Sequence, residues 1–290
     1  MIPQPGAILS VAGSDPSGGA GIQADLKTLT VLGVYGAAAI TSLTVQNTLG
    51  VQSCQPVAPQ LVAQQVKAVL DDLPVTHVKI GMIGSTAVAQ SIAQALTDFS
   101  GEVILDPIVF TSVGQPVAAI DSLDGVRLLA ARAHCLTPNL GELALLSGRP
   151  CPTPAEALQA GLGLLASFPN LRALVVKGGH LLEAEPEITD YLLLAGQPHP
   201  VPHRHRRLLS ANTHGTGCTF ASALAAYHQR SGDYQQAFHL AVDFLDTLLT
   251  LSEGYHFGRG HGGLCHHCFR DQTNTPPSTE KATPDAPRRP

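Results

Sequence analysis

Charged residues are scarce in this sequence, and long hydrophobic runs are absent. Asp, Glu, Lys and Arg make up 13% of the 290 residues, whereas 44% are hydrophobic. This balance excludes a disordered chain, because disordered segments carry too little apolar surface to offset the entropy lost on ordering. The N-terminus has no basic region ahead of its short apolar run, and no apolar stretch is long enough to span a bilayer. We expect a cytoplasmic globular protein with no membrane partner.

A broad basic surface and a dense cysteine framework are also missing. The chain has 17 Lys and Arg against 22 Asp and Glu, a formal net charge of −5. This charge argues against a nucleic-acid partner, and the short basic run at 203–207 is better interpreted as a solvated strand end. The 6 cysteines are scattered through the chain, which favours reduced thiols over a disulfide scaffold.

What the chain does have is a regular alternation of strand and helix patterns. Predicted strands lie at 7–12, 37–45, 77–81, 103–106, 134–136 and 173–177. Predicted helices lie at 21–32, 59–73, 85–99, 122–133, 140–147 and 155–168. Paired strands at 189–195 and 201–209 and two helices at 215–230 and 234–252 close the pattern. Such alternation is typical of an α/β fold with a mainly parallel sheet covered by helices.

No internal repeat and no linker divides this pattern into two domains. We therefore predict one domain over residues 1–270. From 271 to 290 the composition shifts to proline, threonine and charge with almost no apolar residue. That composition predicts a disordered tail.

A glycine-rich turn, Asn212-Thr-His-Gly-Thr-Gly-Cys218, leads into a helix of small residues. Unpaired backbone N–H groups and the positive end of the helix dipole make such a turn an anion site. The same N–H groups should stabilise a Cys218 thiolate, which would then serve as a base toward a hydroxyl group. The alternative is a simple turn followed by a buried, inert cysteine.

A second glycine loop, residues 13–21, follows the first predicted strand. It has neither the Walker spacing nor the dinucleotide fingerprint, so both of those interpretations are rejected. Asp106 and Lys177 each lie at the end of a predicted strand, at the edge where open parallel sheets bind ligands. A lysine there would neutralise the oxygens of a transferring phosphate.

Asn139 and Glu142 lie three residues apart at the start of a predicted helix. An amide and a carboxylate at this spacing suit Mg²⁺ bound beside phosphate, largely through water. An N-cap with an acidic first turn explains the pair equally simply, and by itself is the favoured interpretation. The convergence of glycine loops, a cation, acids and a helix-terminal thiol at strand ends nevertheless indicates phosphoryl transfer.

Six motifs occur in a characteristic order: residues 12–28, Gln46-Asn-Thr48, Lys79-Ile-Gly-Met82, Thr137-Pro-Asn139, Lys177-Gly-Gly-His180 and residues 212–218. In this order they resemble the hydroxymethylpyrimidine/phosphomethylpyrimidine kinases of thiamine biosynthesis, within the ribokinase-like superfamily. The resemblance covers residues 8–267. It implies a three-layer αβα fold, ATP and Mg²⁺ as cofactors, an aminopyrimidine as substrate and a homodimer.

The resemblance also assigns roles to individual residues. Cys218 matches the catalytic base, which is an aspartate in most ribokinase relatives. The implied catalytic and nucleotide-binding residues are Lys177, Thr213, Gly215, Thr216 and Gly217. The implied metal ligands are Asp106, Asn139 and Glu142, and the implied substrate-binding residues are Gly13, Asp25, Thr44, Gln46 and Met82.

Two of the substrate-binding positions also have a chemical interpretation. The amide of Gln46 offers one donor and one acceptor, which complement a ring nitrogen beside an exocyclic amine. Met82 is suited to pack against a ring, although filling a gap in the core is an equally good explanation. The expected reaction is phosphorylation of the hydroxymethyl oxygen and then of the monophosphate.

Two departures from the family's pattern affect this expectation. Val113, in the segment 108–114, replaces a small hydroxyl residue, which makes the second phosphorylation less secure than the first. The chain also ends in Cys265-His-His-Cys268, where zinc is conceivable but adventitious or oxidation-sensitive surface residues are the preferred interpretation. A pyridoxal kinase and a non-catalytic pyrimidine-binding protein remain as alternatives.

Overall fold

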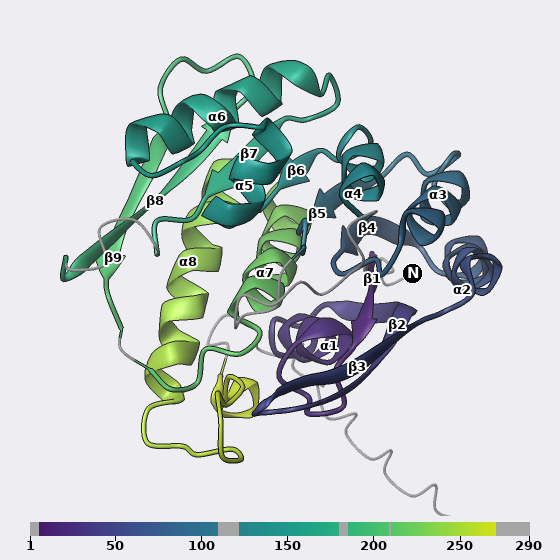
Figure 1. The fold of residues 1–290 in the computed structure, drawn as a ribbon, viewed down its shortest axis with the longest axis horizontal. Helices are drawn as coiled ribbons and strands as arrows, with labels where there is room; N and C mark the ends of the chain where they lie inside the picture. The colour runs from purple at the N-terminus through teal and green to yellow at the C-terminus, as the bar shows by residue number, and fades with distance from the viewer. Residues whose placement is uncertain (1–5, 110–121, 180–184, 209, 271–290) are drawn as a thin grey trace, which may run out of the picture.

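The protein folds around one sheet of nine strands in the order β3-β2-β1-β4-β5-β6-β7-β8-β9 (Figure 1). The computed structural model describes residues 6–109, 122–179, 185–208 and 210–270. Strands β2, β1, β4, β5, β6 and β7 are parallel, and β3, β8 and β9 run antiparallel to their neighbours. The predicted mainly parallel α/β sheet is confirmed.

The strands are β1 (Ala7–Ser14), β2 (Tyr35–Asn47), β3 (Gly50–Pro56), β4 (Val75–Ile80), β5 (Glu102–Leu105), β6 (Cys135–Leu136), β7 (Ala173–Val176), β8 (Glu187–Leu194) and β9 (Val201–Arg206). The helices are α1 (Gly21–Val31), α2 (Pro59–Asp72), α3 (Thr86–Ala95), α4 (Ser122–Ala130), α5 (Leu140–Ser147), α6 (Pro154–Ser167), α7 (Thr216–Ser231), α8 (Tyr234–Leu251) and the short 3₁₀ helix η1 (His266–Cys268).

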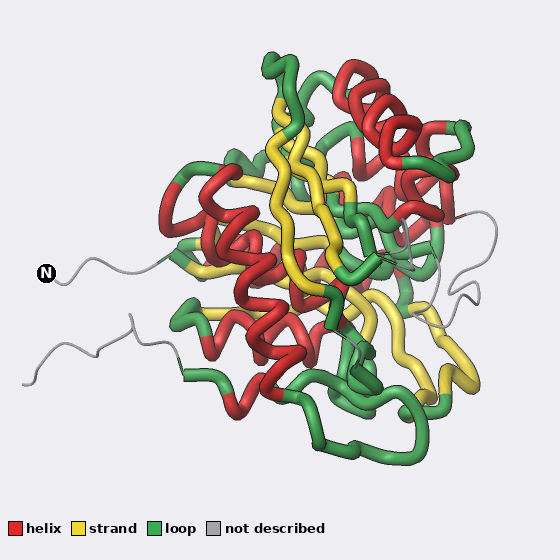
Figure 2. The backbone as a smooth tube through the Cα atoms, turned by 90° about the vertical axis from the view of Figure 1, so that its left-hand side faces the viewer, coloured by secondary structure: helices red, strands yellow, loops and turns green. Residues whose placement is uncertain are grey.

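Helices cover both faces of the sheet, which gives the three αβα layers (Figure 2). Helices α2 to α6 contribute to one apolar cluster with one face of the strands. Helices α1, α7 and α8 contribute to a second cluster on the opposite face. Buried strands between two helical layers explain why the predicted strands are short apolar runs rather than alternating patterns.

Local capping fixes where several helices begin. Ser85, Asn139, Thr153 and Asp233 each accept a backbone hydrogen bond from the first turn of α3, α5, α6 and α8, respectively. These side chains satisfy N–H groups that have no acceptor within their helix.

One strand was not predicted from the sequence. Strand β3 pairs antiparallel with the end of β2, so that β2 and β3 form a hairpin beyond the parallel sheet. The β3 sequence, Gly-Val-Gln-Ser-Cys-Gln-Pro, is mostly polar and largely exposed, which removes the hydrophobic pattern on which strand prediction depends.

Within the described ranges, no helix is long and apolar enough to cross a membrane. The predicted tail at 271–290 lies outside these ranges, as do His180 and Val113.

Candidate active site

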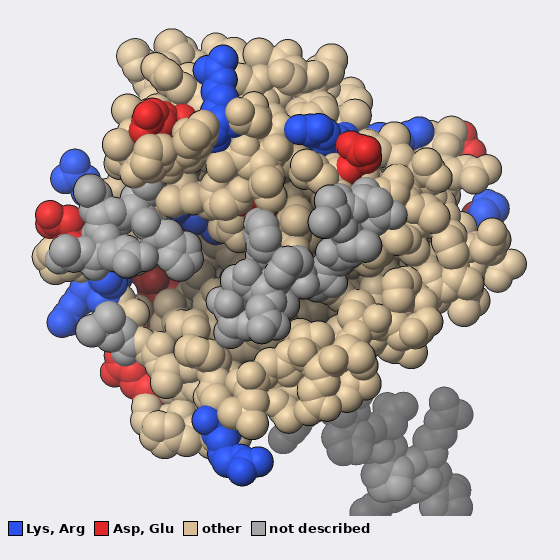
Figure 3. Space-filling model, viewed as in Figure 1, with Lys and Arg blue, Asp and Glu red and all other residues tan. Residues whose placement is uncertain are grey.

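The predicted site residues gather at the carboxyl edge of the parallel strands. The loops after β4, β5 and β7 supply the predicted residues Met82, Asp106 and Lys177, and the loops after β1 and β6 add Asp15 and Thr137. Parallel strands end at the same edge of a sheet, which is where open α/β sheets bind ligands. The face seen in Figure 3 is hollowed near its centre, with acidic and basic atoms visible at the bottom of the hollow.

The start of α7 points its first N–H groups into this region. Gly215 is the N-cap residue and has a φ of 84°, in the left-handed region that favours glycine. A Cβ on Gly217 would lie 3.5 Å from Asp106 Oδ2 and 3.9 Å from Lys177 Nζ. The helix terminus predicted to bind an anion therefore lies beside the predicted cation and the predicted metal-binding carboxylate.

Replacing Gly215 by alanine should both destabilise the protein and impair the site. An added Cβ would overlap the carbonyl oxygen of Gly19, and the φ of 84° would add strain of about 1–3 kcal/mol. Urea unfolding and the rate of ATP consumption would measure the two effects. Gly232→Ala is a matched control, since its φ is 67° but a Cβ there would meet no atom within 4 Å. Equal activity in the two variants would contradict the assignment of Gly215 to the active site.

Asp106 contacts both a hydroxyl group and a lysine in this region. It is buried, it accepts a hydrogen bond of 2.8 Å from the Thr137 hydroxyl, and its Oδ1 lies 3.5 Å from Lys177 Nζ. The Lys177 ammonium also lies 5.5 Å from the centre of the Phe220 ring. These contacts hold a positive and a negative group side by side where β5 and β7 end.

Asn139 and Glu142 form the capping box of α5. Asn139 Oδ1 accepts from the Glu142 N–H at 2.9 Å, and Glu142 Oε2 accepts from the Asn139 N–H at 2.9 Å. The capping alternative is therefore confirmed, and both side chains already serve the start of this helix. Metal binding by these two residues stays a prediction.

Glu142 nevertheless shows that the region suits a divalent cation. Its burial, and next the nearby Asp106 carboxylate, raise the pKa of Glu142 well above its ordinary value. Two carboxylates that disfavour each other's charge are stabilised by a cation between them. The residues present therefore fit Mg²⁺, which needs only one or two carboxylates when phosphate oxygens and water complete its shell.

The Cys218 thiol differs from expectation. Burial raises its pKa to about 11, and the nearby Lys79 ammonium offsets this only in part. The expected stabilisation of a thiolate by the helix terminus is thus outweighed by desolvation. The protonated thiol predominates in this structure near neutral pH.

A buried ion pair lies next to Cys218. Lys79 Nζ contacts the Asp25 oxygens at 2.8 and 2.9 Å, and both side chains are fully buried. The hydroxyls of Ser10 and Ser222 donate to the same carboxylate at 2.6 and 2.8 Å. The Asp25 carboxylate is therefore saturated with donors from the protein, and its predicted contact with substrate remains a prediction.

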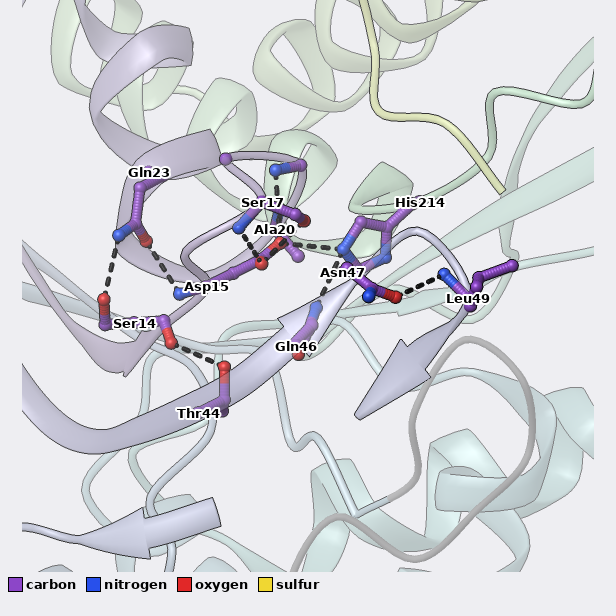
Figure 4. Close-up of polar contacts among 12 residues, drawn as sticks. Ser14, Asp15, Ser17, Ala20, Gln23, Thr44, Gln46, Asn47, Leu49 and His214 are labelled. Atoms are coloured by element: carbon purple, nitrogen blue, oxygen red, sulfur yellow. Dashed lines mark hydrogen bonds and ion pairs between the residues drawn. The ribbon is translucent and has the colours of Figure 1, made fainter. Parts of the chain in front are cut away.

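Gln46 belongs to a second polar network, which joins three parts of the chain (Figure 4). His214 Nε2 lies 3.0 Å from Gln46 Nε2 and 2.8 Å from Asp15 Oδ2. Burial tends to raise the pKa of Asp15, but hydrogen bonds from His214, Ser17 and Ala20 outweigh it and lower the pKa to about 2. Asp15 thus stays ionised and orients the imidazole that contacts Gln46.

Three further predicted substrate-binding residues lie at the end of β1 or contact it. The Thr44 hydroxyl donates to the Ser14 carbonyl at 2.9 Å. A Cβ on Gly13 would overlap Met82 Cε, so the Met82 side chain packs directly on the Gly13 backbone. The structure therefore brings together Gly13, Thr44 and Met82 at the end of β1.

Comparison with known proteins agrees with this geometry. A model of the phosphomethylpyrimidine kinase family matches residues 15–265. The chain belongs to this family. A hydroxymethylpyrimidine/phosphomethylpyrimidine kinase of Salmonella typhimurium is 37% identical over 261 residues, covering 89% of this chain and 96% of that protein. One of Bacillus subtilis is 35% identical over 270 residues, covering 92% and 97%.

Solved structures share the ribokinase-like fold. A phosphomethylpyrimidine kinase of Clostridium difficile has a TM-score of 0.72 and 28% identity, covering 83% of this chain and 98% of that chain. A Bacillus subtilis pyridoxal kinase, solved with ADP, has a TM-score of 0.78 and 27% identity, covering 91% and 98%.

Three residues of this kinase's site received no role from the sequence. Lys79 gave a usable signal, because a charged residue inside the apolar strand 77–81 must find a buried partner. Asp15 and His214 lie inside the two glycine loops, but these two residues are 199 positions apart in the chain. Only folding reveals it.

Proposed function

We propose that this kinase transfers the γ-phosphoryl group of ATP to the hydroxymethyl oxygen of an aminopyrimidine, 4-amino-5-hydroxymethyl-2-methylpyrimidine, in thiamine biosynthesis. The monophosphate is then the acceptor for a second transfer. The observation that carries the proposal is the convergence of the α7 N-terminus, Asp106 and Lys177 beside Cys218. Positioning and charge stabilisation are the main requirements of phosphoryl transfer.

The phosphate-binding part of the proposal uses backbone and charge. When bound, ATP supplies the phosphoryl group, and Mg²⁺ neutralises its phosphate oxygens. The N–H groups of Gly215, Thr216 and Gly217 would donate hydrogen bonds to the phosphate oxygens, with Thr213 beside them. Lys177 adds positive charge, and Asp106 with Glu142 would hold the metal ion.

Cys218 is proposed as the base that takes the proton from the hydroxymethyl oxygen. It lies in the first turn of the same helix, one residue from Gly217. Because its pKa is about 11, only a small fraction is thiolate at neutral pH. The base function therefore depends on the fraction ionised, and Lys79 is the nearby group that increases that fraction.

Gln46 is proposed to recognise the aminopyrimidine ring. Its Nε2 lies 3.0 Å from His214 Nε2, and the amide still has a free N–H and its carbonyl oxygen for the donor and acceptor edge of the ring. Met82, packed on Gly13, supplies an apolar surface for the ring face.

A pyridoxal kinase is the second candidate. The similarity in fold to the pyridoxal kinase of Bacillus subtilis supports it. The test is ADP release by the purified protein with ATP and Mg²⁺, offering hydroxymethylpyrimidine, its monophosphate or pyridoxal. Turnover of both pyrimidines would support the two-step kinase, and turnover of the first alone would limit it to one step. Preference for pyridoxal would overturn the acceptor, and ligand binding without ADP release would indicate a non-catalytic protein.

Replacing Gln46 by glutamate should selectively impair pyrimidine turnover. A carboxylate accepts hydrogen bonds but does not donate, so one of two ring contacts is lost, at a cost of about 1–3 kcal/mol. The expected result is a rise of about tenfold to a hundredfold in KM for hydroxymethylpyrimidine, with KM for ATP unchanged. An unchanged KM for hydroxymethylpyrimidine in this variant would contradict the role of Gln46 in recognising the ring.

The homodimer and the cytoplasmic location stay predictions. Light scattering with size-exclusion chromatography would test the first of these.

A further inference from the structure

The segment Cys265–Cys268 is more buried than the sequence analysis predicted. Cys265 is fully buried and His266 is 2% exposed, so the prediction of surface residues is wrong for both. His266 Nε2 lies 3.1 Å from the Thr219 hydroxyl and faces α7. Two adjacent histidines cannot easily converge with two cysteines on one tetrahedral ion. That difficulty does not arise for a site that uses His267 alone, because the ring of His266 is engaged elsewhere.

The other three residues of this segment converge. One ligand atom each of Cys265, His267 and Cys268 lies within 4.8 Å of the other two. The 3₁₀ turn explains the convergence, since the Cys268 N–H donates to the Cys265 carbonyl at 2.9 Å and brings both ends of the segment together. Tetrahedral zinc with bonds of about 2.3 Å to sulfur needs sulfur atoms about 3.8 Å apart. Small side-chain rotations would achieve this spacing.

We propose that Cys265, His267 and Cys268 form a Zn²⁺ site. Two thiolates and one imidazole are soft and borderline ligands that select zinc over Mg²⁺. Cys265 is buried, Cys268 is half-buried and His267 is exposed, so the ion enters from the solvent side and a water molecule completes its shell. Within the described part of the chain this is the one group of His, Cys, Asp or Glu with such geometry.

Neighbouring groups support the two thiolates. The Tyr255 hydroxyl lies 3.7 Å from Cys268 Sγ and would donate to that sulfur once it is ionised. The Cys265 N–H donates to the Ser252 hydroxyl at 2.9 Å, which fixes the backbone of the buried ligand. Such outer contacts orient the ligands of a metal ion.

The site would anchor the C-terminal segment against the active site. The His214 N–H donates to the Gly262 carbonyl at 3.1 Å, and Thr219, the partner of His266, follows Cys218 directly. Zinc bound at residues 265–268 would therefore hold in place the C-terminal segment, which contacts both the His214 loop and the first turn of α7. We infer a structural role, because its ligands lie in the C-terminal segment around η1 and not at the strand ends that supply Asp106 and Lys177.

The test is Co²⁺ and Zn²⁺ binding to the full-length protein, reduced with a non-chelating phosphine. We expect one Co²⁺ per chain with a thiolate-to-cobalt absorption band, displaced by Zn²⁺, and a higher Tm with Zn²⁺ bound. Cys268→Ser and His267→Gln should weaken binding by more than the ~10–100-fold typical of losing an outer contact. Because His267 is exposed, its variant should still fold. Cys54→Ser and His261→Gln are the matched controls and should bind as the parent does.

Several outcomes would overturn the proposal. One is the absence of a thiolate band in the reduced parent protein, and another is equal loss of binding in the controls. A band that persists in Cys268→Ser but disappears in Cys218→Ala would place the ion at the active-site thiol instead. A thiol count showing Cys265 and Cys268 joined in a disulfide that reductant does not open would also refute it.

Discussion

Replacing Cys218 by alanine is expected to lower kcat about 10²–10⁴-fold, the contribution typical of a general base. The pyrimidine should still bind, because Gln46, Thr44 and Met82 belong to other elements of the site. The measurement is ADP release at saturating ATP, Mg²⁺ and acceptor, together with calorimetric binding of the pyrimidine. Normal turnover by the variant would remove Cys218 from the role of base.

The pH dependence of kcat gives the same assignment a second readout. A base acts only when deprotonated, and the pKa of Cys218 is raised to about 11. Below that value the thiolate fraction increases about tenfold per pH unit, so kcat should rise with pH above neutrality. Cys218→Asp is the matched variant, since an aspartate with a pKa below neutrality is already ionised there. A parent profile as flat as that of Cys218→Asp would contradict the thiol as the base.

Replacing Lys79 by methionine is expected to have the largest effect on stability. It leaves the Asp25 carboxylate fully buried without its counter-ion, which costs about 3–5 kcal/mol of unfolding free energy. Burial alone lowers the pKa of Lys79, but the adjacent Asp25 charge outweighs it and raises that pKa above its ordinary value. The lysine is therefore charged throughout the usable pH range, and the loss should not depend on pH near neutrality.

Urea unfolding would measure this loss, and two further variants make it interpretable. Lys67→Met removes an exposed lysine from its Asp71 partner and should change stability far less. The double variant Lys79→Met with Asp25→Leu removes both charges and should recover much of the stability. Equal destabilisation by the Lys67 and Lys79 variants would show that the buried pair is not important for folding.

The first phosphorylation and the fold are supported by different kinds of observation. The family match and the relatives of 35–37% identity support a pyrimidine acceptor. The structural neighbours include both pyrimidine and pyridoxal kinases, so the fold alone does not separate the two acceptors. We propose that Gln46 makes this separation, and the Gln46 variant tests that proposal.

The sequence by itself determined the strand and helix alternation, the parallel sheet and the two glycine loops. Short stretches of sequence specify these features, because apolar runs, glycine turns and helix periodicity are local patterns. Once the sheet is parallel, its strands end at one edge, so Asp106 and Lys177 were correctly placed together. The polar strand β3 carried no such pattern and was missed.

Only the tertiary structure decided how these groups interact. The contacts of His214 with Gln46 and Asp15 join positions 168 and 199 residues apart, and the Lys79–Asp25 pair joins positions 54 apart. The raised pKa of Cys218 comes from burial, which no spacing along the chain specifies. Asn139 and Glu142 fit either a cap or a metal site by sequence, and the capping hydrogen bonds exist only in the folded helix. Charge, burial and contact between distant segments depend on three-dimensional packing, and this is where sequence patterns stop being informative.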